Sequence, residues 1–308
     1  MSVTHGLENV FREPNGRAVA IGVFDGVHWG HKAIFERLVV EAAELGVEPL
    51  ALTFEKHPAE LLAPNRAPLY INTLEQRISL MQAAGVRSIV VADFNPELAS
   101  LPRQEFVTNV LRDRLQARRV IVGANFRFGK DREGDIRYLS ETLPAYGIRA
   151  VVVPAVIVNA GPVSSTRIRA LIGKGDVETA SKLLGRRFAL RGEVVAGKQI
   201  GRSIGFPTAN IQTEPRQLIP ACGVYAVEVT LERTMHSGVC NIGTRPTFDG
   251  RNMTVEVHIS GFAGNIYGER LDVVFCRRLR DEMAFESPEH LAEQISRDIE
   301  SAQDCSGV

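Results

Sequence analysis

Two histidines three residues apart, His28 and His31, are the first residues whose types and spacing suggest chemistry. At that spacing both imidazoles can lie on one face of a helical turn. Gly30 between them has no side chain, so a phosphate can approach the main chain closely. Imidazole side chains are suited to hold the α-phosphate of a nucleotide and to stabilise its charge during attack. A bare His-x-Gly-His is more often a surface or capping element, so its context decides.

The surroundings of this histidine pair favour a nucleotide site. The apolar run Ala18–Val23 is typical of a buried parallel strand, and Lys32–Leu45 has apolar residues at helical spacing. The motif, with a Gly-x-Phe-Asp-Gly turn at its start, therefore lies where a strand ends and a helix begins. Open α/β sheets bind nucleotides at such places, because helix N–H groups there face an anion.

Two further loops follow expected strands of the same region. In one of them, Asn125 is suited to hydrogen-bond a base or a ribose. Its neighbours Phe126 and Phe128 either pack against a ring system or fill the core. In the other loop, His57 stands before a proline, where it is equally a ligand contact or a structural residue.

Hydroxyls and arginines open a later helical segment. The segment begins at Ser164, Ser165 and Thr166 follow, and Arg169 lies about one turn further on. Hydroxyl side chains at a helix start normally cap it. A capped N-terminus that also carries arginines is a cradle for phosphate groups, so capping and ligand binding are compatible here.

A glycine-rich loop, residues 197–210, is the candidate site of the second half of the chain. It ends in Pro-Thr-Ala-Asn and lacks the Gly-Lys-Ser/Thr ending of a Walker loop. Glycines such as Gly201 allow close approach to phosphates. The side-chain oxygens of Thr208 and Asn210 are hard ligands suited to Mg²⁺. Taken alone, such a loop is a hairpin about as often as it is a site.

Glu256 is the candidate base of the same half. In Val-Glu-Val-His, period-two alternation puts Glu256 and His258 on one face of a strand. A carboxylate there is placed to act as a general base. The residues alone favour the plainer interpretation, a polar side chain on a solvated face of a sheet.

The elements that must position these residues fall into two patterns. Up to about Leu184, apolar runs alternate with amphipathic helical segments, which predicts a doubly wound parallel sheet. The expected strands are Ala18–Phe24, Pro49–Phe54, Ser88–Ala92, Val120–Val122 and Ala150–Val153. The expected helices are Lys32–Leu45, Leu74–Ala84, Gln104–Leu115 and Ile136–Tyr146, with a last short one at Asp176–Leu184.

After Gly185 the pattern changes to short β-rich runs separated by Gly, Pro and Asn turns, which suggests a small antiparallel β-barrel. The runs are Phe188–Val195, Gly223–Leu231, His236–Ile242, Met253–Ile259 and Leu271–Phe275. An amphipathic C-terminal helix, Pro288–Ala302, follows, with Ser287 as its expected N-cap. We therefore predict two domains, residues 1–184 and 185–308.

Composition narrows the classes of function. The chain has 308 residues, enough for about two domains. Its 36 basic and 36 acidic residues cancel, which gives no support to a nucleic-acid or membrane partner. Met1–Gly16 lacks the apolar core of a signal peptide, and the four cysteines show neither disulfide nor zinc spacing. We expect a cytoplasmic protein with free thiols, whose barrel edges and loops leave room for a homo-oligomer without specifying one.

Together, these motifs resemble one family across essentially the whole chain. The chain is similar to prokaryotic bifunctional riboflavin kinase/FAD synthetase in Gly22–His31, Asn125–Gly129, Ser164–Arg169, Gly201–Asn210, Gly223–Tyr225, Asn241–Phe248 and Glu256–His258. Each motif alone is moderately specific, whereas their joint occurrence in the family's order is highly specific. The resemblance implies that the barrel phosphorylates riboflavin with ATP to give FMN. It implies that the α/β domain joins FMN to AMP from a second ATP, giving FAD and pyrophosphate.

The resemblance also implies roles for single residues. His28 and His31 would lie at the α-phosphate, and Glu256 would act as base toward the ribityl hydroxyl. Thr208 and Asn210 would bind Mg²⁺ as well as ATP phosphates. The ATP-binding residues would be Gly22, Phe24, Asp25, Asn125, Ser165, Thr166 and Arg169 in the first domain, and Gly201, Thr208 and Asn210 in the second. The chain departs from the common family pattern at Lys56, where many members have proline.

Two other functions are compatible with parts of the sequence. One is a single-activity His-x-Gly-His nucleotidyltransferase, acting on nicotinamide mononucleotide or phosphopantetheine and fused to a binding barrel. The intact Pro207–Asn210 segment and Glu256 argue against it. The other is a non-catalytic flavin sensor, which the intact histidine pair disfavours. Turnover of ATP separates both from a bifunctional enzyme.

Overall fold

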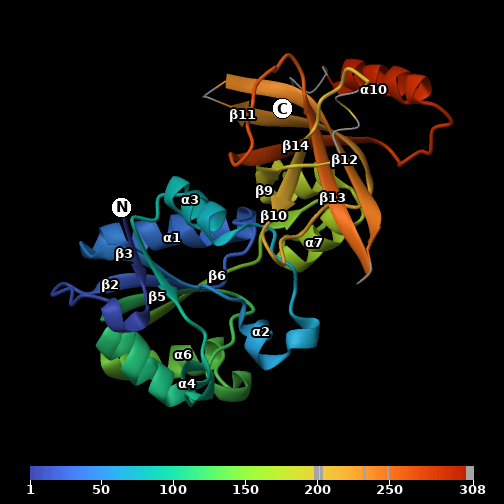
Figure 1. Ribbon diagram of the computed structural model, residues 1–308. Coiled ribbons are helices and arrows are strands. Elements are labelled where there is room, and N and C mark those ends of the chain that lie inside the picture. The colour runs from blue at the N-terminus through green and yellow to red at the C-terminus, as the bar shows by residue number, and fades with distance from the viewer. Residues whose placement is uncertain (198–200, 202–203, 232–233, 248–249, 303–308) are drawn as a thin grey trace. The chain divides into compact units, whose positions relative to one another are not determined.

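The structure is a computed structural model, and the described chain forms two compact units (Figure 1). One unit comprises residues 1–68 and 74–164, and the other comprises residues 69–73 and 165–308. Residues 198–200, 202–203, 232–233, 248–249 and 303–308 lie outside the described part, as do the side chains of residues 245–252. The predicted domains, residues 1–184 and 185–308, assign one activity to each part of the chain, and this assignment stays a prediction.

A parallel sheet of six strands forms the first unit. The strands are β1 (Ser2–His5), β2 (Arg17–Ile21), β3 (Glu48–Phe54), β4 (Ser88–Ala92), β5 (Ala117–Gly123) and β6 (Arg149–Val153). Their order is β1-β4-β3-β2-β5-β6, and every neighbouring pair is parallel. The winding direction reverses between β2 and β5. The prediction of a doubly wound parallel sheet is thus confirmed.

Helices cover both faces of this sheet, with α1 and α3 on one face and α4 and α6 on the other (Figure 1). The helices are α1 (Trp29–Leu45), α2 (Pro58–Leu62), α3 (Leu74–Ala83), α4 (Pro96–Ser100), α5 (Arg103–Glu105), η3 (Phe106–Arg114, of π type) and α6 (Ile136–Thr142). The short 3₁₀ turns are η1 (Leu7–Asn9), η2 (Pro64–Arg66), η4 (Lys130–Arg132) and η5 (Leu143–Tyr146), and a small hairpin is formed by β7 (Ile157–Val158) and β8 (Gly161–Pro162).

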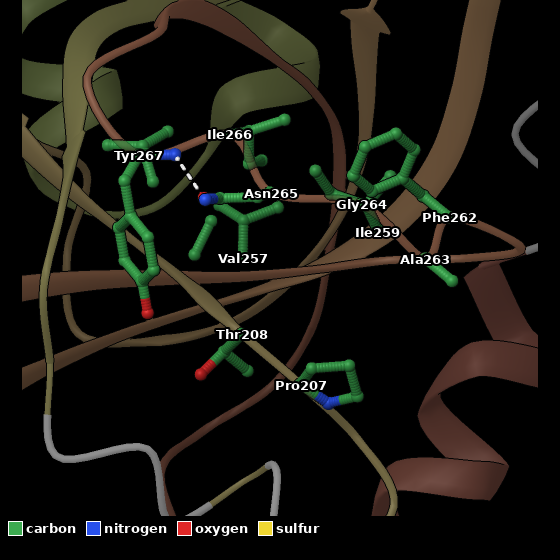
Figure 2. Close-up of a pocket in the computed structure, with 12 residues that line it drawn as sticks. Pro207, Thr208, Val257, Ile259, Phe262, Ala263, Gly264, Asn265, Ile266 and Tyr267 are labelled. Carbon is green, nitrogen blue, oxygen red and sulfur yellow. Dashed lines mark hydrogen bonds between the residues drawn. The ribbon is translucent and has the colours of Figure 1, made fainter.

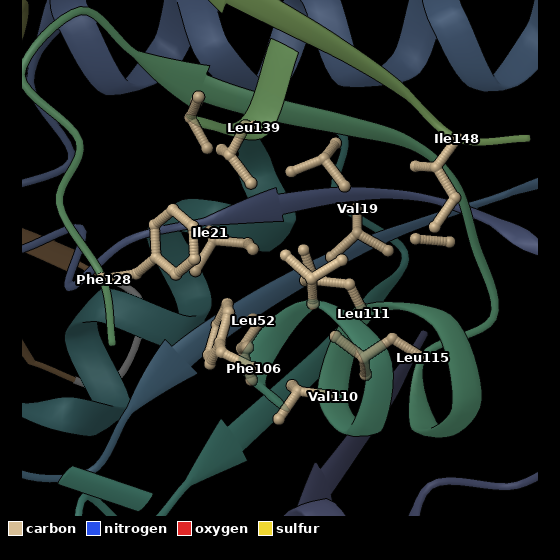
Figure 3. Packing of buried hydrophobic residues seen from close by; sticks show 14 of the residues in the cluster. Val19, Ile21, Leu52, Phe106, Val110, Leu111, Leu115, Phe128, Leu139 and Ile148 are labelled. Carbon is tan, nitrogen blue, oxygen red and sulfur yellow. The ribbon is translucent and has the colours of Figure 1, made fainter. Parts of the chain in front are cut away.

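Alternating residues of the central strand β2 point into two separate cores. Val19 and Ile21 belong to the cluster in Figure 3, where Phe106 and Leu111 of η3 pack against the sheet. On the other face, Ala18 and Ala20 pack beneath α1 with Phe35 and Leu38. Both faces of a parallel sheet are buried in this way, so its strands read as continuous apolar runs. The ends of β2 are therefore held rigidly in place.

Strand β1 was not among the expected strands. It pairs only with β4, through Ser2↔Ser88 to His5↔Val91, and so forms one edge of the sheet. Its residues are mostly exposed, because an edge strand has a neighbour on one side only. Met1–Gly16 accordingly lacks the apolar run by which the inner strands are detected.

The second unit is a closed antiparallel barrel, which confirms the prediction for this half. Its strands are β9 (Phe188–Val195), β10 (Ala209–Thr213), β11 (Gly223–Leu231), β12 (Thr234–Thr247), β13 (Gly250–Ile259) and β14 (Arg270–Arg280), in the closed order β10-β13-β12-β11-β14-β9. Before the barrel come α7 (Ser165–Gly173) and α8 (Val177–Leu184), and after it comes α10 (Pro288–Ala302). Closure leaves no free sheet edge to pair with another chain.

The C-terminal helix α10 is present as predicted and packs on the outside of the barrel. Ala302 and Ile299 of α10 lie against Ala226 of β11. Asp298 of the same helix accepts hydrogen bonds from Arg280, with a shortest distance of 2.7 Å. The main-chain N–H of His290 donates to Ser287 Oγ, as expected of an N-cap.

A five-residue segment from the first half of the sequence, Leu69–Thr73, belongs to the barrel unit. Its Tyr70 donates its main-chain N–H to Arg216 O at 2.8 Å and accepts from Leu218 N at 2.8 Å. Ile71 is fully buried there. We call Leu69–Thr73 the strap.

The thiols agree with the expectation of free cysteines as far as the structure describes them. Cys222, Cys240 and Cys276 are not in disulfide bonds, and Cys305 lies outside the described residues. Burial raises the pKa of the Cys240 thiol, so this side chain stays protonated and unreactive. In the described part of the chain, no helix has both the length and the apolar character needed to cross a membrane.

Candidate active sites

The histidine motif lies at the carboxyl end of β2, beside the carboxyl end of β5. This is the point where the winding of the sheet reverses, and open α/β sheets bind ligands in the crevice there. Helix α1 begins at Trp29, three residues before the expected start, with His28 as its N-cap. His28 Nδ1 accepts a hydrogen bond from the main-chain N–H of His31 at 3.3 Å. The first turn of α1 therefore carries both imidazoles.

The two imidazole rings are stacked on each other. Their centroids are 3.7 Å apart and their planes are inclined by 17°. Phe24 contacts His31 edge-on, with 5.4 Å between ring centroids. A Cβ at Gly30 would lie 3.1 Å from Cε1 of His28, so this position favours glycine. His28 is 5 % exposed, which means that its imidazole is held in one orientation.

The turn before the histidines has an unusual backbone. Phe24 and Val27 have positive φ values of 53° and 39°, although neither is glycine. Such conformations persist only where the surrounding structure enforces them, and they gather at functional sites. Phe24 and Asp25 are buried, and the ring of Phe24 covers Gly22. The structure thus brings Gly22, Phe24 and Asp25 together with the histidine pair.

Arg77 of α3 holds this turn in place, although the sequence analysis did not single it out. Its guanidinium donates to Val23 O at 3.0 Å and to Phe54 O at 2.5 Å, so it joins the ends of β2 and β3. Thr53 Oγ1 also donates to Val23 O. Arg77 is 1 % exposed. The detectable signal is a charged residue three positions after Leu74, on the buried side of a helix.

In the loop after β5, Asn125 is exposed, whereas Phe126 and Phe128 pack into the core. Asn125 is exposed at the carboxyl end of β5, next to β2 in the sheet. Phe128 is buried and packs on Phe106 with 5.2 Å between centroids, which supports its interpretation as a core residue. Phe126 is partly buried and stacks on Phe128. Asn125 is therefore the polar side chain that this loop presents beside the histidine turn.

His57 has a structural role in this fold. It is the N-cap of α2, and its Nδ1 accepts from the main-chain N–H of Ala59 at 3.0 Å. Glu60 Oε1 in turn accepts from the main-chain N–H of His57, which completes a capping box. Of the two readings of His57, the structure therefore supplies direct contacts for the structural one.

The three residues assigned to phosphates by resemblance belong to the second unit. Ser165 and Thr166 are the first residues of α7, which begins one position after the expected start at Ser164, and Arg169 follows one turn later. Arg169 Nε donates to Leu69 O of the strap at 2.7 Å. Their relation to the histidine pair of the first unit stays a prediction.

In the barrel, Glu256 lies in a row of polar residues across three strands. It is the register partner of Asn210 on β10 and of Asn241 on β12. Directly opposed residues in antiparallel strands have Cβ atoms only about 4.5–5.5 Å apart. Glu256 is only partly exposed, and its neighbours Val255 and Val257 point into the barrel. Glu256 therefore lies on the opposite face of β13 from these two valines. Asn241 joins it in the row, although the sequence pattern had placed Asn241 only within a motif.

Several contacts hold the main chain before β10 next to the row formed by Asn210, Glu256 and Asn241. His258 Nδ1 lies 2.9 Å from Pro207 O, so the Pro-Thr-Ala-Asn segment is tied to β13. A Cβ at Gly197 would overlap the side-chain amide of Asn210, so glycine leaves the space that this amide occupies. Phe206 N donates to Gly201 O at 2.8 Å, which closes the described part of the loop. Residues 198–200 and 202–203 of the expected loop lie outside the described residues.

A cavity of about 570 Å³ opens beside Thr208. Figure 2 shows Thr208 and Pro207 on one side of it and the loop from Phe262 to Tyr267 on the other. The lining is largely apolar and consists of Val194, Pro207, Thr208, Ala209, Val257, Ile259, Phe262, Ala263, Gly264, Asn265, Ile266 and Tyr267. Tyr267 N donates to Asn265 Oδ1 at 3.2 Å and so orders the loop. A cavity of this size and composition suits a flat ring system.

Two family models match the chain, one in each half. A family model for FAD synthetase matches residues 10–167, and one for riboflavin kinase matches residues 184–306. Together they account for nearly the whole sequence. The first match includes the histidine motif and Asn125, and the second includes Thr208, Asn210 and Glu256.

Full-length relatives carry the same pair of activities in their names. The chain is 38 % identical to a bifunctional riboflavin kinase/FMN adenylyltransferase of Pseudomonas fluorescens, over 98 % of this chain and 97 % of that protein. It is 36 % identical to the protein of the same name from Escherichia coli K12, over 100 % and 99 % of the two chains.

A solved structure from Streptococcus pneumoniae also matches. It bears the name macrolide-efflux protein, has a TM-score of 0.88 and 32 % identity, and the match covers 98 % of this chain and 99 % of that one.

Proposed function

The chain belongs to the bifunctional riboflavin kinase/FMN adenylyltransferase family, and from that premise we propose which of its residues carry the two reactions. The riboflavin kinase domain transfers the γ-phosphoryl group of ATP to riboflavin and gives FMN. The FAD synthetase domain joins FMN to AMP from ATP and releases pyrophosphate. Both reactions are phosphoryl-type transfers, in which positioning and charge stabilisation provide most of the rate.

For adenylyl transfer, we assign charge stabilisation at the α-phosphate to His28 and His31. A phosphate oxygen of FMN attacks the α-phosphorus of ATP, and the bond to the leaving pyrophosphate breaks. Negative charge on the α-phosphate oxygens is met by the two imidazoles and by the positive end of the dipole of α1. The stacking of the two rings and the burial of His28 support this role, because they keep the imidazoles in place before the reaction.

The remaining residues of the adenylyl site bind ATP in this proposal. Gly22, Phe24 and Asp25 shape the turn, and the exposed Asn125 holds the base or ribose. The hydroxyls of Ser165 and Thr166 and the guanidinium of Arg169 serve the ATP phosphates. Support for the last three is their place at the start of α7 and the family resemblance.

Arg77→Met tests whether the turn must be held for adenylyl transfer. The variant loses the donors to Val23 O and Phe54 O, so the turn relaxes and the histidine pair shifts. We expect kcat for FAD formation to fall by roughly tenfold to a hundredfold, since small displacements of catalytic groups are costly. Riboflavin phosphorylation should not change. Both rates are measured by chromatography of the flavins.

Arg137→Met is the matched control, because Arg137 is exposed on α6 and its ion pair in the described part of the chain is with Glu141. Arg77→Lys should restore part of the rate, since one ammonium retains a donor toward these carbonyls. If both activities fall together, in proportion to the folded fraction measured in thermal melts, the role of Arg77 is purely structural.

For the kinase, Glu256 acts as general base toward the 5′-hydroxyl of riboflavin. The hydroxyl oxygen attacks the γ-phosphorus, ADP leaves, and the proton passes to the carboxylate as the bond forms. A primary alcohol gives up its proton only late, so a partly buried carboxylate in fixed geometry is required. The register of Glu256 between Asn210 and Asn241 supports this assignment.

Mg²⁺ is the cofactor that we propose for ATP in the barrel. Among the described residues, no group of three His, Cys, Asp or Glu side chains is placed to hold a metal ion. Mg²⁺ commonly takes only one or two protein oxygens and completes its shell with phosphates and water. Thr208 Oγ1 and Asn210 Oδ1 fit that role. Bound there, Mg²⁺ would neutralise phosphate charge.

The cavity beside Thr208 receives the adenine ring in this proposal, because the triphosphate would extend from it past Thr208. Ala263→Trp fills part of the space, and we expect KM for ATP in the kinase reaction to rise by roughly tenfold, about 1.4 kcal/mol. Ala145→Trp, at an exposed alanine of η5, is the control. A rise in KM for riboflavin instead of ATP would assign the cavity to the flavin.

Incubation of the purified chain with riboflavin, ATP and Mg²⁺ tests the whole proposal. FMN should appear first and FAD should follow. We place the enzyme in the cytoplasm, without nucleic-acid or membrane partners, and assign the two activities to residues 1–184 and 185–308. Whether the chain forms a homo-oligomer is decided by its mass in solution.

A further inference from the structure

A concave, arginine-rich surface lies at the end of the parallel sheet away from the histidine motif. Its volume is about 440 Å³, and it is lined by Val10, Arg12, Arg112, Asp113, Arg114 and Gln116. It adjoins the amino ends of β2 and β5, where Arg17 N donates to Gln116 O at 3.0 Å. The adenylyl site is at the carboxyl ends of these strands, about 15–20 Å away along a five-residue strand. We call this surface the arginine pocket.

The walls of the arginine pocket are held together by defined contacts. Gln116 Oε1 accepts from the main-chain N–H of Glu13 at 2.6 Å, which joins the segment after η1 to the turn after η3. The buried Arg17 spans the same two segments, donating to Phe11 O at 2.9 Å and to Leu115 O at 3.4 Å. The pocket is therefore preorganised, since its two sides do not need to be brought together by a ligand.

The positive charge of the pocket is only partly balanced. Arg112 forms an ion pair with Asp113, at 2.6 Å. Arg114 makes a long 3.4 Å contact to the main-chain oxygen of Glu8. Arg12 makes no hydrogen bond or ion pair with any residue that the structure describes. Three guanidinium groups thus face one carboxylate.

Capping of a helix dipole accounts for only part of this arrangement. Arg112 and Arg114 are in the last turn of η3, where positive side chains offset the partial negative charge of the helix end. Arg12 comes from a separate segment, so capping by the residues of η3 itself does not account for its place in the pocket. Guanidinium groups from two segments around one hollow are the arrangement that recognises phosphate groups by paired hydrogen bonds.

We propose that the arginine pocket is a further polyphosphate-binding site, distinct from the two catalytic sites, that takes a diphosphate or triphosphate group. A single phosphate would leave most of about 440 Å³ unfilled and could not span the separate arginines. Among the compounds that the two reactions use or release, ATP, ADP and pyrophosphate carry such a group at one end, and pyrophosphate and ATP serve as the probes. The proposal rests on the residues of the pocket and holds whichever residues prove catalytic.

The first experiment compares pyrophosphate binding by the full chain and by its Arg12→Ala/Arg114→Ala variant. Equilibrium dialysis at low ionic strength should show one more bound pyrophosphate per parent chain than per variant chain. Affinity at that site should fall by roughly tenfold or more, as expected when charged hydrogen bonds are removed. FMN and FAD formation at low substrate should be unchanged. Arg137→Ala, on a distant exposed face, should bind like the parent.

The second experiment uses the unaltered protein, so it does not depend on the folding of a variant. Phenylglyoxal modifies exposed arginines, and mass spectrometry reports the extent at each position. Pyrophosphate or ATP should protect Arg12 and Arg114 while Arg137 stays reactive. Protection by ATP alone would identify the nucleotide as the source of the group. The proposal is overturned if neither ligand protects these arginines. It is also overturned if parent and variant bind equal numbers of pyrophosphate in dialysis and ATP does not protect.

Discussion

Glu256→Gln should abolish riboflavin phosphorylation and leave FMN adenylylation intact. The amide has nearly the shape of the carboxylate but cannot accept the proton of the attacking hydroxyl. We expect the rate of FMN formation to fall by about 10²–10⁴-fold, the usual contribution of a positioned general base. The row that holds Glu256 between Asn210 and Asn241 should survive, because main-chain pairing of the strands sets this register.

Two substrates separate the outcomes of this test. Supplied with riboflavin, the variant should yield neither FMN nor FAD, whereas supplied with FMN it should yield FAD at the parental rate. Glu193→Gln is the matched control, since Glu193 is an exposed carboxylate on strand β9 of the same barrel. A kinase rate close to that of the parent would assign the base to another residue and return Glu256 to a merely polar position.

His28→Asn should remove adenylyl transfer and spare the kinase. Asparagine is among the best N-cap residues, so its side-chain oxygen can still accept from His31 N and keep the start of α1. Only the imidazole, its stacking on His31 and its proposed contact with the α-phosphate are lost. We expect FAD formation from FMN to fall by roughly 10²–10³-fold, as for other donors that stabilise a developing negative charge.

A second substitution at the same position distinguishes chemistry from capping. His28→Leu loses both the imidazole and the cap, at a further cost of about 1 kcal/mol in stability. If His28 only caps α1, the asparagine variant should keep its activity and the leucine variant should lose it. If the imidazole acts on phosphate, both should lose FAD formation, and only the leucine variant should also melt earlier.

Local patterns explain why much of both sites could be predicted from the sequence. The histidine motif, its strand and its helix are contiguous, so the strand–turn–helix context is visible without the fold. The alternation around Glu256 likewise reports its face directly. The family resemblance then adds roles that residue patterns leave open.

Residues defined by distant partners could not be found in this way. Arg77 acts on main-chain carbonyls of two strands, and carbonyls carry no sequence signature. Asn241 gains meaning only from the register of β12 with β13. Strand β10 reads Ala-Asn-Ile-Gln-Thr, with Ile211 as its buried residue, so its pairing with β9 and β13 outweighs a weak local pattern.

The strap limits how the gene for this chain can be divided into two separate genes. A gene divided at codon 184 would place Tyr70 on one polypeptide and its partners Arg216 and Leu218 on the other. The shorter product would expose main-chain groups that Tyr70 satisfies in the intact protein, and it would lose the buried Ile71. Recombination that exchanges one module must therefore carry along a short piece of the other. A free-standing kinase descended from such a chain would have to evolve a substitute for these five residues.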